Sequence, residues 1–352
     1  MKNEQVLYQI NQLPIFQNRM YASEIEAREC PKGDLCLVQN LDTGLIYNKK
    51  FQPELMVYDE NYQNEQAISP FFQDHLTKVS QIIEQYIGRK KIVEVGCGKG
   101  HFMEMLLADG FDVTGYDPAY QGDNKNVIKE YFMPGSGISA DGIILRHVLE
   151  HIEDPVSFLG LLKEANGGTG KIYIEVPCFD WICEHHAWFD IFYEHVNYFR
   201  LADFDSMFGT VYESGKIFGG QYLYVVADIG SIRTPVINLK QTLNFPNDFL
   251  SNLDKIKQKK EESVIVWGGS SKGVTFSLLK ERSGTPVSSV IDINPAKQGN
   301  FLPATGLRVQ SPEDVLPKLV PMSTIWVMNS NYLEEIKRMS RNNYNYICLD
   351  YE

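Results

Sequence analysis

A glycine-rich turn between a short apolar strand and a helix is the feature that most constrains the fold of this chain. Residues 91–95 form an apolar run that predicts a buried strand, and residues 102–108 have helical spacing. Between them stand Gly96, Gly98 and Gly100, which let the backbone turn tightly with positive φ. The unpaired N–H groups at the start of the helix predict a ligand site there. The turn alone leaves open a dinucleotide-binding domain, or a turn used only for packing.

Strand and helix signals alternate along the residues that follow this turn. Apolar runs at residues 112–116, 143–145 and 171–176 predict strands, and residues 156–165 have the spacing of a helix. This β–α alternation predicts a parallel sheet with helices on both faces. The predicted fold class is therefore α/β, with a Rossmann-like core.

The same signals divide the chain into three regions. Residues 1–75 contain short strand-like runs separated by turns, which predicts a small β-rich N-terminal cap. Residues 76–248 form the predicted core. Residues 249–352 begin with a lysine-rich helix at 249–260 and then restart the strand, glycine turn and helix pattern. This last region predicts a C-terminal Rossmann-like domain.

The composition excludes several classes of protein. Hydrophobic residues make up 43% of the chain and charged residues 22%, a balance typical of a globular protein with a buried core. The net charge of -12 repels phosphate and anionic lipid, so we expect neither a nucleic-acid nor a membrane partner. The six cysteines include no CxxC pair, and no signal-peptide or membrane-spanning pattern is present. We therefore expect a cytoplasmic protein, and the sequence indicates no oligomeric state.

Three details around the glycine turn indicate S-adenosylmethionine as the bound cofactor. Glu94 precedes the glycines, where a carboxylate helps to orient the methionine part of this cofactor. Asp117 ends the next strand about 20 residues further on, where an acid accepts bonds from ribose hydroxyls. The segment after the strand at 143–145 faces the ligand crevice in such folds. We expect these residues to bind the cofactor: Glu94, Gly96, Cys97, Gly98, Gly100, Asp117, Pro118, Arg146 and His147.

Further motifs are shared across nearly the whole chain with one known family. They are Tyr58-Asp59-Glu60-Asn61-Tyr62, Ser69-Pro70-Phe71, the turn at 94–100, His151-Ile152, Tyr193-Glu194-His195, Trp267-Gly268, Lys272-Gly273 and the segment from Asp292 to Gly306. With these motifs the chain resembles the sugar C-methyltransferase family, which methylates nucleotide-linked keto-deoxysugars. The resemblance implies a class I S-adenosylmethionine methyltransferase core. It also implies that the C-terminal domain closes over the nucleotide of the substrate.

The chain departs from the family pattern at two places. Family members carry a zinc knot of four cysteines in the cap, but the corresponding segments here, residues 16–19 and 39–44, contain no cysteine. Cys30 and Cys36 are too isolated to rebuild a zinc site, so we expect a cap that folds without metal, and no metal elsewhere. The family's usual Tyr-x-Glu-His also begins here with Phe192, which lacks the hydroxyl.

The resemblance implies that His195 is the general base. Methylation of carbon next to a ketone requires removal of a C–H proton, and a neutral imidazole suits that step at cellular pH. Glu194 would bond the sugar or set a neighbouring tautomer. The alternative for Glu194 and His195 is a purely structural ion pair or helix cap.

Three further residues are implied near the ketone oxygen. His151 and Tyr62 would steady that oxygen or the enolate, and Tyr193 would replace the hydroxyl missing at Phe192. The alternatives are that His151 is a satisfied core histidine and that Tyr62 packs its ring under the cap. Tyr58 competes with Tyr62 for the same role.

The leading hypothesis is C-methylation of a small-molecule substrate, a nucleotide-linked 4-keto sugar, by S-adenosylmethionine. O- or N-methylation of a glycan precursor on the same scaffold is the alternative favoured by the change at Phe192. A protein that binds the cofactor without turnover is a third possibility, and a dehydrogenase is the weakest.

Overall fold

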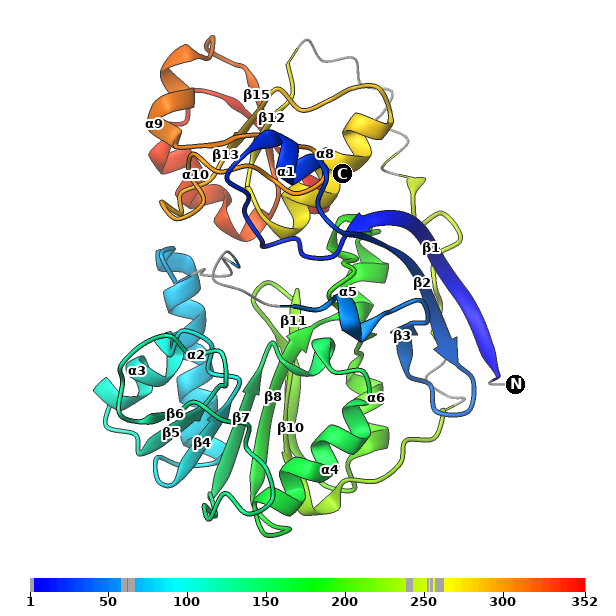
Figure 1. The fold of residues 1–352 in the computed structure, drawn as a ribbon, viewed down its shortest axis with the longest axis vertical. Helices are drawn as coiled ribbons and strands as arrows, with labels where there is room; N and C mark the ends of the chain where they lie inside the picture. The colour runs from blue at the N-terminus through cyan, green and yellow to red at the C-terminus, as the bar shows by residue number, and fades with distance from the viewer. Residues whose placement is uncertain are drawn as a thin grey trace.

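The computed structural model describes residues 3–57, 62, 67–238, 243–251, 253, 256 and 263–351. These residues form three β-sheets, which Figure 1 shows in the lower half, in the upper half and along one side of the molecule. No helix in the described part of the chain is long and apolar enough to cross a lipid bilayer.

The largest sheet has seven strands in the order β10-β11-β8-β7-β4-β5-β6. The strands from β8 to β6 are parallel, and β11 and β10 run antiparallel at the edge beside β8. The bounds are β4 (Ile92–Val95), β5 (Val113–Tyr116), β6 (Val127–Ile128), β7 (Gly142–Arg146), β8 (Lys171–Pro177), β10 (Val211–Ile217) and β11 (Tyr222–Asp228). The central strands β4 and β7 are buried on both faces, which explains their continuous apolar runs.

Helices cover both faces of this sheet (Figure 1). Buried side chains of α2 and α3 pack on one face, and those of α4 and α6 pack on the other. The helices are α2 (Pro70–Tyr86), α3 (His101–Ala108), α4 (Pro155–Ala165), α5 (Phe179–Glu184) and α6 (Leu201–Met207). Short 3-10 turns connect these elements at η1 (Pro53–Leu55), η2 (Leu149–His151), η3 (Trp188–Asp190) and η4 (Ile229–Ser231).

Helix α2 begins before the predicted boundary between cap and core. The predicted core begins at residue 76, but the helix starts at Pro70. Ser69 caps its N-terminus by accepting the N–H of Phe72 at 3.4 Å, and proline suits the first helical position because its missing N–H would be unpaired there. The boundary at residue 75 therefore falls inside a continuous helix.

The N-terminal cap is a four-stranded antiparallel sheet with the order β1-β2-β3-β9. Its elements are β1 (Glu4–Pro14), α1 (Glu24–Arg28), β2 (Lys32–Asn40), β3 (Ile46–Asn48) and β9 (Asn197–Tyr198). Strand β9 belongs to the predicted core, so the segment after His195 completes the cap sheet. At one position expected for cysteines, the Asn40 side chain caps a turn by accepting the N–H groups of Asp42 (2.8 Å) and Thr43 (3.0 Å).

The C-terminal domain is a five-stranded parallel sheet with the order β14-β13-β12-β15-β16. Its elements are β12 (Ile265–Trp267), α8 (Ser271–Arg282), β13 (Ser289–Ile291), β14 (Val309–Gln310), α9 (Pro312–Val315), η5 (Leu316–Lys318), β15 (Thr324–Val327), η6 (Ser330–Tyr332), α10 (Leu333–Met339), β16 (Asn345–Cys348) and η7 (Leu349–Tyr351). The helix predicted over 249–260 lies mostly outside the described residues, although Ser251, Leu253 and Ile256 are helical.

Candidate functional site

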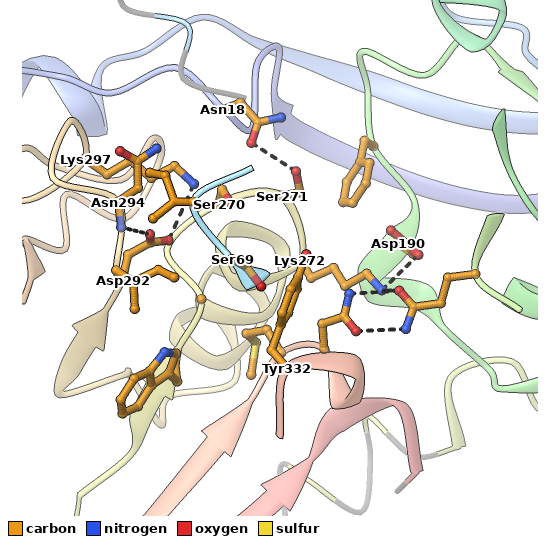
Figure 2. A pocket seen from close by; sticks show the side chains of 18 of the residues that line it. Asn18, Ser69, Asp190, Ser270, Ser271, Lys272, Asp292, Asn294, Lys297 and Tyr332 are labelled. Atoms are coloured by element: carbon orange, nitrogen blue, oxygen red, sulfur yellow. Dashed lines mark hydrogen bonds and ion pairs between the residues drawn. The ribbon is translucent and has the colours of Figure 1, made fainter. Parts of the chain in front are cut away.

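A cavity lies between the seven-stranded sheet and the C-terminal domain, and the cap reaches its rim. The core side of the wall includes His147, His151 and His195. Figure 2 shows the opposite side, which the cap and the C-terminal domain form with Asn18, Ser271, Lys272, Asp292 and Lys297. The cavity therefore gathers polar side chains from all three regions of the chain.

The glycine turn between β4 and α3 has the predicted backbone conformation. Gly96, Gly98 and Gly100 have φ of 73°, 56° and 81°. A Cβ on Gly98 would meet no atom within 4 Å, so the turn is open on that side. Asp117 at the end of β5 accepts the N–H of Gly98 at 2.7 Å and that of Ala119 at 2.8 Å. Turn and acid thus meet at the carboxyl ends of parallel strands, where ligands bind in such sheets.

Glu94 lies in β4 just before the turn and is buried. Burial raises the pKa of its carboxyl to about 7, against the opposing charge of Arg146 and with a further rise from Asp117. Its Oε2 atom has no hydrogen-bond partner among the described residues. A buried carboxylate oxygen without a donor fits a ligand that brings positive charge or N–H groups to the turn.

Cys97 and Pro118 flank this arrangement in different ways. Cys97 is buried, and its Sγ packs so closely on Gly115 that a Cβ there would lie 2.8 Å from the sulfur. Pro118 is exposed beside Asp117. The Cys97 side chain therefore packs the glycine turn against strand β5.

A carboxylate that the sequence analysis did not single out organises the floor of the core. Glu175 in β8 is fully buried and accepts bonds from Arg146 Nη2 at 2.9 Å and Tyr173 OH at 2.8 Å. Its Oε1 also lies 3.1 Å from Nε2 of His75 and 3.1 Å from Nε2 of His147. Burial opposes ionisation, but Arg146, His147 and His75 hold the pKa of Glu175 well below its usual range. The guanidinium of Arg146, predicted to bind the cofactor, is thus engaged in a structural ion pair.

His147 joins this buried cluster to the cavity. Its φ of 51° is unusual for a residue with a side chain and sets the ring toward the two acids. Nδ1 lies 3.4 Å from Oε1 of Glu150, and Nε2 contacts Glu175. Burial lowers the pKa of His147, but the two carboxylates outweigh it and raise the value to about 9. The cavity wall therefore carries an imidazolium at neutral pH.

His151 and His195 face each other with ring centroids 4.9 Å apart and planes at 81°. Nδ1 of His151 lies 2.9 Å from the carbonyl oxygen of Glu194. Because a carbonyl only accepts, Nδ1 carries the proton, and Nε2 is the nitrogen with the lone pair. Nδ1 of His195 has no hydrogen-bond partner among the described residues, and the ring packs on Phe192 at 5.0 Å. Burial, reinforced by His151, lowers the pKa of His195 to about 3, so its imidazole is neutral.

Glu150 completes this group. Ligand atoms of Glu150, His151 and His195 all lie within 4.8 Å of one another. In the described part of the chain this is the one group of three or more His, Cys, Asp or Glu side chains so arranged. Oε2 of Glu150 is buried and lacks a partner there. The three side chains therefore lie close enough together to share one ion, whereas the sequence predicted no metal.

Glu194 lies behind the imidazole pair and connects it to the cap. Its buried carboxylate accepts the hydroxyl of Tyr62 at 2.8 Å and the N–H of Gln17 at 3.2 Å. Asn18 Nδ2 donates to the same Tyr62 hydroxyl at 3.5 Å. Tyr62 lines the cavity, so the expected delivery of a tyrosine from the cap agrees with its position. Tyr58, the competing tyrosine, lies outside the described residues.

The expectation for Tyr193 is wrong in its geometry. The ring is fully buried in the cap, where a Cβ on Gly33 would lie 2.3 Å from it. Its hydroxyl accepts the N–H of Gln52 at 3.0 Å and does not line the cavity. Side chains at neighbouring positions of an extended segment point to opposite sides, so Phe192 faces the cavity and Tyr193 faces away.

The C-terminal domain repeats the contact between glycine turn and acid. The N–H of Gly269 donates to Oδ2 of Asp292 at 2.8 Å, just as Gly98 donates to Asp117. Asp292 follows β13 as Asp117 follows β5. Lys297 Nζ lies 3.5 Å from the same Oδ2 and also lines the cavity (Figure 2). The protein therefore has two Rossmann-like turns, one in the core after β4 and one in the C-terminal domain after β12.

Two parts of the chain match known family models. Residues 62–211 match a methyltransferase domain, and residues 239–346 match a C-methyltransferase C-terminal domain. The chain is a methyltransferase. The first match and the strand order of the large sheet confirm the predicted class I methyltransferase fold. The pair of matches is consistent with a C-methyltransferase family.

Comparison with solved structures gives similarities that cover about half of this chain. The 1,6-didemethyltoxoflavin-N1-methyltransferase of Burkholderia thailandensis is 16% identical over 45% of this chain and 80% of its own, with a TM-score of 0.35. The N-methyltransferase NodS of Bradyrhizobium japonicum is 15% identical over 46% of this chain and 98% of its own, with a TM-score of 0.34. A SAM-dependent methyltransferase of Archaeoglobus fulgidus is 17% identical over 46% of this chain and 100% of its own, with a TM-score of 0.32. No curated protein matches the chain.

The predicted site residues of this methyltransferase fall into two groups in the structure. Glu94, the three glycines and Asp117 gather around the turn at the end of β4. His147, His151, His195 and Tyr62 line the cavity, with Glu194 directly behind them. The sequence analysis missed Glu150 and Glu175. An acid within the apolar run of β8 was a signal for Glu175, but nothing near Glu150 in the sequence pointed to His195, which lies more than forty residues away.

Proposed function

We propose that this methyltransferase transfers a methyl group from S-adenosylmethionine to carbon of a nucleotide-linked 4-keto sugar. The observation that carries the proposal is the pair of turns with their acids, Gly98 with Asp117 and Gly269 with Asp292. The imidazole-lined cavity lies between the two domains that hold them. One turn suits the adenosine of the cofactor, and the other suits the nucleoside of the substrate.

The residues around the first turn fit the cofactor. Gly98 leaves open space for a close approach, and Asp117 retains lone pairs for ribose hydroxyls. The unpartnered Oε2 of Glu94 would accept bonds from the methionine part. S-adenosylmethionine supplies an electrophilic methyl group on a positively charged sulfonium. His147, which follows the predicted cofactor residue Arg146, lines the cavity in which the acceptor would bind.

The second turn supports a nucleotide on the acceptor. Asp292 is a buried acid at the end of a parallel strand, the position from which acids bond ribose. Lys297 and Lys272 line the same wall, each paired with a carboxylate, and the remaining N–H donors of their ammonium groups would suit a pyrophosphate. An acceptor held there by its nucleotide would extend its sugar toward His151 and His195.

Two routes exist for the proton that leaves the carbon next to the ketone. In the first, the neutral imidazole of His195 takes it directly, as the sequence predicted. In the second, the Tyr62 oxygen takes it while the Tyr62 proton passes to Glu194, 2.8 Å away. Both nitrogens of His147 are engaged by Glu150 and Glu175, so its imidazolium would stabilise the enolate oxygen through its charge alone. The enolate carbon then attacks the methyl group in line.

A turnover assay with nucleotide sugars tests the proposal. Incubation of the full chain with S-adenosylmethionine and a keto sugar nucleotide should yield S-adenosylhomocysteine and a product heavier by one CH₂ unit. The matched sugar nucleotide with a hydroxyl in place of the ketone should not react. We expect the variant that removes the proton route, His195→Gln or Tyr62→Phe, to lose about 10²- to 10⁴-fold in kcat. Absence of S-adenosylhomocysteine with every keto sugar nucleotide would refute the assignment.

O-methylation of a glycan precursor is the second candidate function. The position of Phe192 favours it, because this ring packs on His195 at the cavity wall where the family carries a hydroxyl. A less polar wall changes how a ketone would be held. Product analysis separates the two reactions, since the protons of an O–CH₃ group resonate at lower field than those of a C–CH₃ group.

A further inference from the structure

Three side chains at the cavity wall, Glu150, His151 and His195, bring possible ligand atoms close together. Glu150 and His151 come from η2, directly after β7, and His195 comes from the loop before β9. Their ligand atoms lie within 4.8 Å of one another. Oε2 of Glu150 and Nδ1 of His195 are buried and have no hydrogen-bond partner in the described part of the chain. A buried polar atom without a partner raises the free energy of the folded state, and a ligand shared by these side chains would remove that penalty.

Neighbouring groups orient two of the three side chains, Glu150 and His151. The Glu194 carbonyl fixes His151 in the tautomer whose Nε2 carries the lone pair. His147 Nδ1 lies 3.4 Å from Oε1 of Glu150, and the other oxygen, Oε2, has no hydrogen-bond partner among the described residues. Outer groups thus orient Glu150 and His151, whereas the ring of His195 is held by packing on Phe192.

We propose that Glu150, His151 and His195 bind one divalent transition-metal ion whose remaining coordination positions face the cavity. Two imidazoles and one carboxylate are the donor set preferred by zinc, iron, cobalt and manganese, whereas magnesium and calcium prefer oxygen ligands. Three protein ligands on one side leave room for water or a substrate oxygen on the other. All three residues line the cavity, so an acceptor there reaches the ion directly.

The ion would hold the oxygen of the acceptor next to the methylated atom. This role rests on the proposed function, whereas the binding of the ion does not. A cation at that oxygen stabilises the charge of an enolate, or lowers the pKa of an acceptor hydroxyl. The lone pair of His195 cannot bind an ion and take a proton at once. In the loaded protein the proton therefore leaves through Tyr62 to Glu194.

Cobalt titration of the chelator-stripped full chain tests the binding without any substrate. We expect one Co²⁺ per chain, with visible absorption typical of nitrogen and oxygen ligands, and its displacement by Zn²⁺. Glu150→Gln and His195→Ala should abolish this saturable absorption. His101→Ala is the matched control, because His101 is exposed on α3 and should leave the titration unchanged. Thermal unfolding of each variant, with His195→Asn as a smaller change, checks that the loss is not misfolding.

Several outcomes decide the question separately from the methyl-transfer proposal. Absence of saturable Co²⁺ binding, or equal binding by wild type, Glu150→Gln and His195→Asn, would overturn the metal site. Tyr62→Phe should bind Co²⁺ as wild type does, since Tyr62 is not a ligand. If the ion binds but no nucleotide sugar is methylated, the site stands and the proposed function falls. If methylation proceeds unchanged in the presence of a chelator and no ion binds, the proposed function stands and the metal site falls.

Discussion

At the residue scale, the core depends on a few buried charges that compensate one another. Glu175 is surrounded by Arg146, His75, His147 and Tyr173, and none of these contacts exceeds 3.1 Å. Removing one member of such a cluster leaves the others uncompensated in a low dielectric, which is why networks of this kind are all-or-none. The cluster also keeps His147 charged at the cavity wall.

Glu94 gives the first prediction, a pH dependence of cofactor affinity. Burial raises the pKa of Glu94 to about 7, so in the free protein its carboxyl is largely protonated at pH 6 and largely ionised at pH 8. A positively charged cofactor favours the ionised form, and its binding therefore releases this proton. Affinity should rise with pH up to about 7, by at most about tenfold per pH unit, and then level off.

Calorimetric titration of S-adenosylmethionine between pH 6 and 8 measures this effect. Glu94→Gln removes the titrating carboxyl and should flatten the profile while keeping the shape of the side chain. The amino group of the cofactor titrates equally in both proteins, so the difference between them isolates Glu94. Parallel profiles for wild type and Glu94→Gln would contradict the prediction.

At the element scale, local signals in the sequence were sufficient where an element is specified by its own residues. The strands β4, β5, β7 and β8 follow their apolar runs, and α3 follows the glycine turn. The edge pair β10 and β11 was not predicted, because β10 mixes polar and apolar residues and is stabilised by pairing with β11. The start of α2 was missed because its signal, Ser69 before Pro70, is a cap and not a periodic pattern.

The site shows the same division between local and long-range information. Asp117 was predictable because it ends the strand after the glycine turn. The meeting of Glu150 with His195 depends on the loop before β9, which joins the cap sheet from a distant part of the sequence. Tyr193 was misplaced for the same reason, since its burial follows from packing against Gly33 in the cap.

The glycine turn gives the second prediction. Gly98 and Gly110 both have positive φ, at 56° and 85°, and a Cβ on either would meet nothing closer than 3.9 Å in the protein. Alanine at either position should therefore cost about 1 kcal/mol of stability through backbone strain alone. Only Gly98→Ala places a methyl group where the cofactor approaches, so only it should weaken S-adenosylmethionine binding, by about tenfold or more. Equal losses of affinity in the two variants would show that the turn does not contact the cofactor.

At the scale of the whole molecule, polar contacts hold the three regions around one cavity. Ser69 at the start of α2 donates to Glu335 of α10 at 2.7 Å. Tyr21 of the cap and Phe301 of the C-terminal domain exchange backbone bonds at 3.1 and 2.9 Å. Because Ser69 and Glu335 line the cavity, the relative position of the core and the C-terminal domain sets the geometry available to an acceptor.

Lys272 links the C-terminal domain to the core and gives the third prediction. Its Nζ lies 2.8 Å from Gln221 Oε1 and 3.3 Å from Asp190 Oδ2, and both charged side chains are only 12% exposed. Lys272→Ala strands a buried carboxylate, so it should cost about 3 kcal/mol in free energy of unfolding. Pairing it with Asp190→Asn should recover at least about 1 kcal/mol, because the double variant leaves no uncompensated charge.

Denaturant unfolding of wild type, the two single variants and the double variant completes this double-mutant cycle and measures the coupling energy between Lys272 and Asp190. The exposed pair of Lys216 and Glu184, at 3.2 Å within the core, is the matched control and should show a coupling of about 0–1 kcal/mol. If the buried pair couples no more strongly than this exposed one, Lys272 does not hold the domains together. If it does, Lys272→Ala should also weaken nucleotide-sugar binding while leaving S-adenosylmethionine affinity unchanged, since the glycine turn of the core lies outside the contact that is lost.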